Sequence, residues 1–99
     1  MSITYEAIYN GSFMKTEEIP EELLRLKKAV ESYLVVSLED RGRVANSWLY
    51  DNPQAETKLA ITESLGPKKT LAVTVMYPAD CSDLPKDITE KFKLTKKVA

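Results

Sequence analysis

Apolar and polar residues alternate in two segments of the chain, residues 2–9 and residues 70–77. Successive side chains of a strand point to opposite faces, so both segments are predicted to be half-buried strands. The positions that share the apolar face are Ile3, Tyr5, Ala7, Tyr9, Leu71, Val73, Val75 and Tyr77. Pro78 is expected to end the second strand, because proline has no amide hydrogen for a sheet. Asn10-Gly11 offers a turn after the first.

A helical period follows in residues 20–34, where Leu23, Leu26 and Val30 are three and four positions apart. This spacing places them on one stripe of a helix. Pro20 suits the first turn, and the two glutamates that follow it suit the positive end of the helix dipole. Leu24 lies at the edge of the stripe and is expected to be exposed.

The middle of the chain is less regular. Residues 35–38 are rich in β-branched and apolar side chains and predict a strand, and residues 39–42 have the composition of a turn. Residues 43–50 alternate again. Residues 55–64 fit a helix, with Asn52-Pro53 to start it and Gly66-Pro67 to stop it, and we prefer that interpretation. They also fit a strand, since Leu59 and Ile61 alternate with polar neighbours.

The resulting order is β-α-β-β-α-β, a ferredoxin-like α+β layout with both helices on one face of an antiparallel sheet. If residues 55–64 form a strand, the alternative is one helix packed on an antiparallel meander. Residues 1–78 are predicted to form a single α+β domain. Residues 79–99 are predicted to be a basic C-terminal extension that either packs on the domain or stays apart. Asp83-Leu84-Pro85 opens a helix or precedes a last strand.

Composition narrows the class of protein. The chain has 99 residues, of which 43% are apolar and 29% are charged, which suits one globular domain. The single cysteine, Cys81, allows no internal disulfide and fits a reducing compartment. No leader-like segment or membrane-length apolar run is found. We therefore expect a cytoplasmic protein that makes no membrane contact.

Candidate catalytic groups are scarce. The chain has no histidine, which excludes the triads that depend on it, and its three glycines form no phosphate loop. The carboxylates of residues 17–22 suit a helix N-terminus. Asp80, Asp83 and Asp87 lack the spacing of a calcium loop. We therefore predict no enzyme activity, no metal and no cofactor.

The predicted strands give the sheet two different faces. The aromatic side chains Tyr5, Tyr9, Trp48, Tyr50 and Tyr77 share the apolar face and are expected in the core. The other face shows small and weakly polar residues with a few apolar ones, and it can accept a partner unless residues 79–99 cover it. We predict a small regulator, adaptor or inhibitor of another protein. The partner on this face could also be a second copy of the chain, which would make a homodimer. A phage origin fits this class of protein, but no residue supports it. The expected contact residues are Ile8, Leu24, Leu49, Thr74 and Met76.

Charge suggests a second function. Residues 67–99 contain seven lysines and four acidic residues, a net charge of +3. Lysines bind phosphates weakly and in a salt-sensitive way. The alternative is therefore a nucleic-acid accessory protein that acts through Lys68, Lys69, Lys91, Lys93, Lys96 and Lys97. The predicted element order is that of the RNA-recognition motif, but residues 41–48 lack that motif's alternating aromatics, and no membership is inferred.

Overall fold

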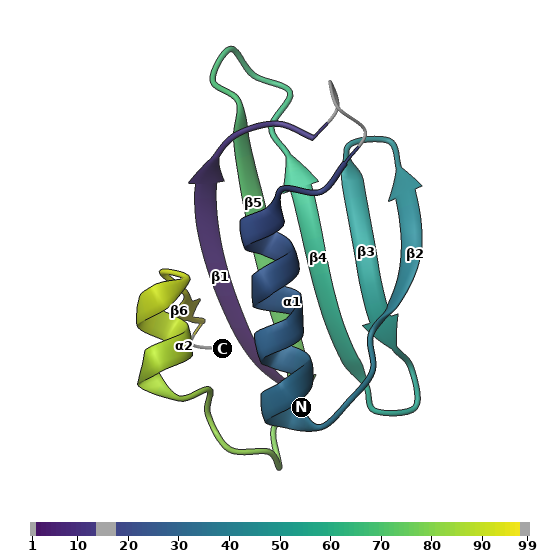
Figure 1. Ribbon diagram of the computed structural model, residues 1–99, viewed down its shortest axis with the longest axis vertical. Coiled ribbons are helices and arrows are strands. Elements are labelled where there is room, and N and C mark those ends of the chain that lie inside the picture. Colours follow the sequence, from purple (N-terminus) through teal and green to yellow (C-terminus); the bar gives the residue numbers. More distant parts are fainter. Residues whose placement is uncertain (1, 14–17, 98–99) are drawn as a thin grey trace.

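One antiparallel sheet and two helices make up residues 2–13 and 18–97, the part of the chain that the computed structural model describes (Figure 1). Along the chain the elements are β1 (Ser2–Asn10), α1 (Glu21–Leu34), β2 (Glu39–Val44), β3 (Ser47–Asn52), β4 (Thr57–Glu63), β5 (Thr70–Pro78), α2 (Lys86–Lys91) and β6 (Thr95–Lys96). The strands lie in the order β2-β3-β4-β5-β1-β6. The protein is thus a small, compact domain of mixed α and β content.

Helix α1 lies across one face of the sheet and forms the core with it (Figure 1). Its side chains Leu23, Leu26 and Val30 are at most 2% exposed, as the spacing predicted. They pack over strand residues such as Val73 and Val75, which are fully buried. The alternation in β1 and β5 is confirmed, because these two strands pair along their whole length with the predicted apolar face turned to the helix.

The ferredoxin-like prediction is wrong. Residues 57–63 form strand β4, so within the described residues the sheet carries one helix of 14 residues and one short helix of 6. β4 pairs with β3 on one side and β5 on the other, and Thr57, Leu59, Ile61 and Glu63 are buried between them. Strands β2 to β5 therefore follow one another as an antiparallel meander.

The predicted turn before β3 is also misplaced. Residues 35–38 form no strand, because Val35 ends α1 with φ 54°. Glu31 holds this segment: its carbonyl accepts a hydrogen bond from the Val35 amide, and its carboxylate accepts one from the Leu38 amide. Residues 39–44 are strand β2, and the hairpin turn falls at Ala45-Asn46. The register shifts between Asp40 and Arg43, at a bulge that contains Gly42 with φ 80°. Val44 pairs with Ser47 across this turn, so it lies on the side away from α1 and is 78% exposed, although the alternation of residues 43–50 gave it the side of Trp48 and Tyr50.

The C-terminal segment joins the same core. Leu84, Phe92 and Leu94 are 5–7% exposed and belong to the buried cluster. The Tyr9 hydroxyl donates a hydrogen bond to the Phe92 carbonyl, and the Leu84 amide donates one to the Tyr5 hydroxyl. Both tyrosines lie on the face that carries α1, so α2 packs beside β1 on that side. Strand β6 then extends the sheet at its edge.

Candidate protein-binding face

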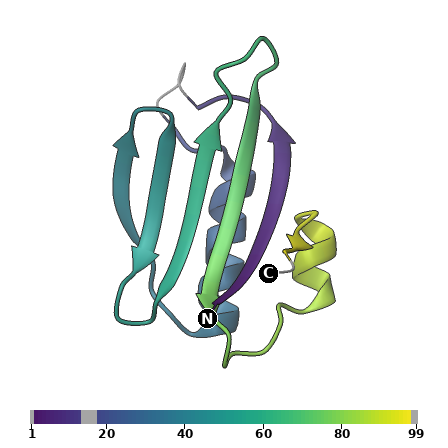
Figure 2. The ribbon, with the colours of Figure 1, turned by 180° about the vertical axis from the view of Figure 1, so that it is seen from behind.

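The sheet face opposite α1 is left uncovered by the described segments (Figure 2). We call it the open face. It follows from the strand register, because paired residues in neighbouring strands point to the same side. Among its residues are Thr4, Glu6, Ile8, Ser47, Leu49, Asp51, Lys58, Ala60, Thr62, Ala72, Thr74 and Met76. The question that the sequence left open, whether residues 79–99 cover this face, is answered for residues up to 97: they do not.

The middle of the open face is made of small and apolar side chains. One row runs across four strands from Glu6 through Thr74 and Ala60 to Leu49. A neighbouring row joins Ile8 to Ala72. Thr74, Ala72 and Ala60 are short and half-buried, so the surface between the strands is low and even. Ile8 stands out from it with 65% of its surface exposed.

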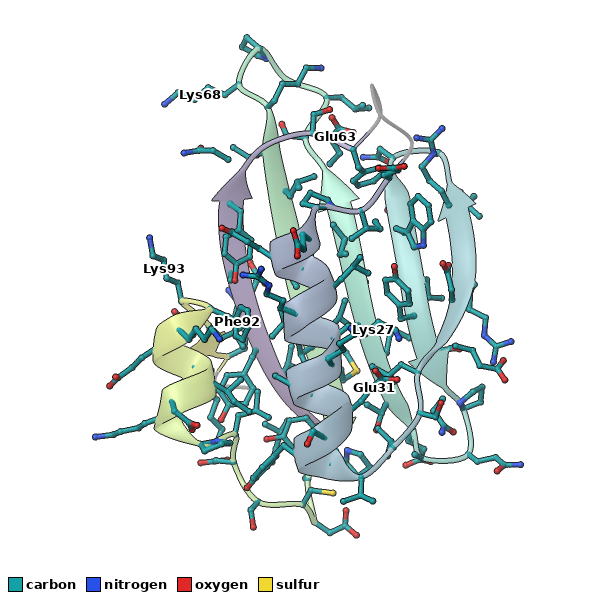
Figure 3. The ribbon with its side chains drawn as sticks, viewed as in Figure 1. Lys27, Glu31, Glu63, Lys68, Phe92 and Lys93 are labelled. Carbon is teal, nitrogen blue, oxygen red and sulfur yellow. The ribbon has the colours of Figure 1, made fainter. Side chains whose placement is uncertain are left out.

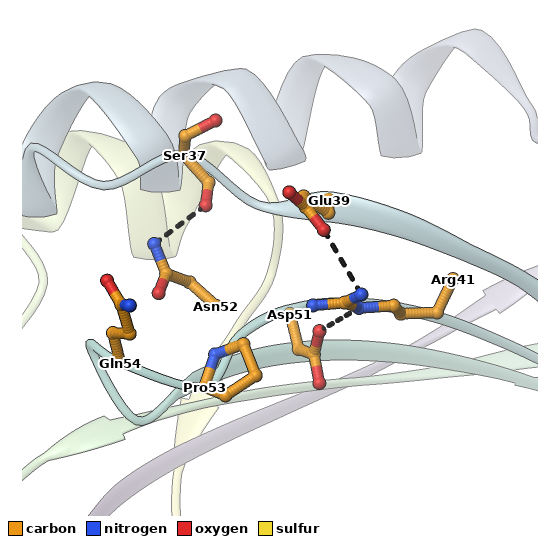
Figure 4. A pocket seen from close by; sticks show the side chains of 7 residues that line it. All are labelled: Ser37, Glu39, Arg41, Asp51, Asn52, Pro53 and Gln54. Atoms are coloured by element: carbon orange, nitrogen blue, oxygen red, sulfur yellow. Dashed lines mark hydrogen bonds and ion pairs between the residues drawn. The ribbon is translucent and has the colours of Figure 1, made fainter.

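Charged residues lie at the β2 end of this face (Figure 4). Arg41 Nε is 2.5 Å from Asp51 Oδ1, and Arg41 Nη1 is 3.1 Å from Glu39 Oε2. The hydrogen bond that Arg41 donates to the Asp51 carboxylate raises the pKa of Arg41. Beside this trio, the Asn52 amide donates to the Ser37 carbonyl at 3.0 Å, and the space between them forms a shallow polar pocket. The guanidinium already pairs with two carboxylates, so this pocket presents no free cation to a ligand.

The structure brings four of the five predicted contact residues together. Ile8, Leu49, Thr74 and Met76 all lie on the open face, as the alternation predicted. Leu24 does not join them, because it lies on α1 and is 38% exposed beside Arg25 and Lys28. Whether any of these residues contacts a partner stays a prediction.

The six predicted lysines are divided between the β4–β5 loop and the C-terminal segment. Lys68 and Lys69 lie in the β4–β5 loop, and Lys91 ends α2. Lys96 Nζ is 2.9 Å from Asp83 Oδ1, which raises the pKa of Lys96, and Lys97 Nζ is 3.5 Å from Glu6 Oε2. Lys93 follows α2 with φ 53°. The Phe92 ring beside Lys91 is buried in the core and is not free to stack on a base.

The sequence pattern did not single out two side chains of β4. Lys58 lies on the open face, opposite Asp51 and Met76. It was missed because residues 55–64 were interpreted as a helix, and the alternation of Leu59 and Ile61 was the signal that could have revealed it. Glu63 is fully buried on the core side.

The buried Glu63 carboxylate ties two segments to β4. Its Oε1 accepts a hydrogen bond from the Ser12 hydroxyl, and its backbone exchanges hydrogen bonds with Asn46. Its Oε2 has no hydrogen-bond partner among the described residues. A buried carboxylate oxygen without a partner is costly. The hydrogen bonds of Glu63 therefore hold the end of β1 against the β2–β3 turn.

The described residues contain no group of three histidine, cysteine, aspartate or glutamate side chains placed to hold a metal ion. No helix among them has the length and apolar character needed to span a membrane. No protein-family model, curated protein or solved structure matches this chain. Its function must therefore be argued from the geometry of its own surfaces.

Proposed function

We propose that this chain is a non-catalytic protein-binding module, a small regulator, adaptor or inhibitor, and that a partner protein covers its open face. The observation that carries the proposal is the middle of that face, where small and apolar side chains extend over four strands with no described segment above them. A sheet face that meets only water usually carries polar and charged residues.

Low side-chain entropy supports this use of the face. Thr74, Ala72 and Ala60 have few rotamers to lose when a partner covers them. Ile8 supplies an apolar anchor because most of its side chain is exposed. Charged groups lie around this centre, with Glu39, Arg41 and Asp51 toward β2, Lys58 beside Asp51 on β4, and the Glu6–Lys97 pair at β6. This is the arrangement of an interface with an apolar centre and a polar rim.

Nucleic-acid binding through the C-terminal lysines remains the alternative, with less support. Lys96 and Lys97 are engaged in ion pairs, and Phe92 is buried. The residues of the open face include no aromatic ring on which a base could stack. Removing residues 91–99 would be a poor test of this alternative, because it would take Phe92 and Leu94 out of the core.

The proposal is tested with Thr74→Arg in a tagged protein used for capture from a lysate of the source organism. The new guanidinium would stand in the centre of the open face, where a partner would have to bury it. We expect loss of the captured protein, with the melting temperature within about 3 °C of the wild type, because Thr74 is not in the core.

Ser32→Arg is the matched control, since Ser32 is exposed on α1 and the substitution adds the same charge on the other side of the molecule. It should retain the captured protein. Each capture is repeated after nuclease treatment, and sedimentation of the purified chain tests for a second copy on the face. Equal capture by Thr74→Arg and the wild type would refute the open face as the contact surface.

A further inference from the structure

The outer edge of β1 is only partly paired. β6 pairs with Tyr5 and Glu6, and the Lys97 amide donates to the Thr4 carbonyl at 2.8 Å. In an antiparallel pair, every second residue directs both its N–H and its C=O to the same neighbour. Because Thr4 faces β6, the backbones of Ile8 and Asn10 face that side as well. They lie beyond the last β6 pair, and no described strand continues beside them.

The chain is held away from this edge by its own packing. Lys93 has φ 53°, and the Leu94 amide donates to the Thr89 carbonyl at 2.8 Å, which closes the end of α2. Leu94 is buried, and the Tyr9 hydroxyl binds the Phe92 carbonyl. These contacts fix the approach to β6 next to the middle of β1. The end of β1 therefore stays open in Figure 1 without a neighbouring strand on its outer side.

The opposite edge of the sheet is protected by residues of the edge strand itself, whereas the Ile8–Asn10 edge is not. Proteins block exposed edges with charge and bulges. β2 has both, with four charged residues among its six and the bulge at Gly42. Residues 8–10 of β1 have neither a charge nor a proline, and their pairing with β5 is regular. Ile8 is the most exposed apolar side chain of β1.

Positive charge surrounds the open edge. Lys68 and Lys93 both project past the β1 side of the sheet (Figure 3). Lys69 adjoins the end of β1, because its carbonyl accepts a hydrogen bond from the Gly11 amide at 2.9 Å. None of these three lysines forms an ion pair with another described residue. The edge therefore suits a negatively charged partner.

A shallow pocket lies on each side of the edge. On the open-face side the lining is Glu6, Ala7, Ile8, Lys93, Thr95 and Lys97. On the helix side the lining is Tyr9, Glu22, Arg25, Lys91, Phe92 and Lys93, with three cationic side chains against one carboxylate. Side chains of an added strand would point alternately to the two sides. Both pockets contain lysine, so acidic side chains would find a cation on either side.

We propose that the Ile8–Asn10 edge of β1 accepts an extended acidic segment of a partner protein as an added strand, in line with β6. Unpaired backbone N–H and C=O groups are complemented by another peptide backbone, which a sugar–phosphate chain cannot supply. This observation favours a peptide over a nucleic acid. The inference concerns the edge and does not depend on the proposed role of the open face.

The probe is the peptide Glu-Val-Glu-Val-Glu-Val-Glu, labelled with fluorescein and titrated with the full chain in fluorescence anisotropy at about 50 mM salt, where charge attraction is weakly screened. Asn10→Pro removes an outward-facing amide that β5 does not use, and we expect it to weaken binding about tenfold. Asn10→Ala keeps the amide and should bind within about twofold of the wild type. The same titration of Thr74→Arg should also stay within about twofold, which separates this edge from the open face.

Charge is tested with a double reversal. Lys68→Glu with Lys93→Glu should weaken peptide binding about tenfold or more, whereas Lys28→Glu with Lys86→Glu, which changes the net charge equally at exposed positions elsewhere, should stay within about threefold. In NMR spectra of the wild type, the amides of Ile8 and Asn10 should shift most on addition of the peptide.

Three results would overturn the proposal. One is equal affinity of the Asn10→Pro and Asn10→Ala variants for the peptide. The second is a set of amide shifts in the wild type that leaves Ile8 and Asn10 unchanged, a result that holds even if Asn10→Pro fails to fold. The third is tighter binding of a fluorescein-labelled oligothymidylate than of the peptide at the same salt concentration, which would assign these lysines to nucleic acid.

Discussion

At the scale of single residues, a strained backbone position lies at the end of α1. Val35 has φ 54°, a left-handed conformation that L-residues avoid and that is worst for a β-branched side chain. Its amide still donates to the Glu31 carbonyl, as glycine usually does at a helix end. The Val35 side chain is 88% exposed and contributes little packing in return. The contacts around Glu31, including the Leu38 amide at 2.8 Å, hold the chain in this conformation.

Val35→Gly is therefore expected to stabilise the protein by about 1 kcal/mol, because glycine adopts positive φ without strain. The measurement is the free energy of unfolding from urea titration. Val44→Gly serves as the control, since Val44 is also exposed but sits in strand β2, where glycine should lower stability by roughly 0.5–1 kcal/mol. If Val35→Gly lowered stability instead, the side chain would be making a contact worth more than the strain.

At the scale of elements, the segment after β5 has two roles. It closes one side of the core through Leu84, Phe92 and Leu94, and it covers part of the β1 edge with β6. Only two residue pairs join β6 to β1, so the packing of Phe92 and Leu94 holds this strand more than the strand pairing does. The short helix α2 has no fully buried side chain of its own.

Phe92→Ala should consequently release α2 and β6 before the rest of the sheet unfolds. We expect a loss of about 3 kcal/mol in the stability of that segment, because a large buried ring is removed. Hydrogen exchange should accelerate at the Lys97 amide, which binds the Thr4 carbonyl. Exchange at the Ser64 amide, which binds the Thr70 carbonyl, is the internal control. Phe92→Leu should show a smaller effect; equal acceleration at both amides would mean that the segment is not a separate unit.

At the scale of the whole molecule, buried tyrosines link stability to alkaline pH. Burial, with a smaller effect of the Asp40 charge, raises the pKa of Tyr50 from 10.0 to about 12. Burial also raises the pKa of Tyr77, with Tyr5 as a further cause. The unfolded chain loses the protons of these tyrosine hydroxyls near pH 10, whereas the folded chain keeps them to a higher pH. Their contribution is therefore complete below pH 10 and is lost as the pH rises toward the folded-state pKa.

We expect the free energy of unfolding to fall from about pH 10 upward, by about 1.4 kcal/mol per pH unit for each such tyrosine. Circular dichroism follows unfolding, and ultraviolet absorbance follows phenolate formation in the same samples. Tyr50→Phe should make the fall in stability less steep, because one titrating group is removed. An unchanged slope in Tyr50→Phe would show that Tyr50 ionises equally easily in the folded and unfolded chain.

The sequence by itself determined the elements whose signals are local and strong. Pro20 and the stripe of Leu23, Leu26 and Val30 specify α1, and the long alternations specify β1 and β5 together with the side that each presents to the core. The open face was predictable for the same reason, since it is the complement of the apolar face. Lys58 was the exception, because its strand was not recognised.

Only the tertiary structure decided the rest. Residues 57–63 carry helical end signals and strand-like alternation at once, and pairing with β3 and β5 on both sides selected the strand. The pairing of β2 with β3 fixed the turn at Ala45-Asn46, and the contacts around Glu31 hold Val35 in a conformation that no local preference favours. The packing of Phe92 and Leu94 in the core determines where β6 pairs with β1, and so which part of the β1 edge stays free. Such choices depend on residues distant in sequence, so no local pattern contains them.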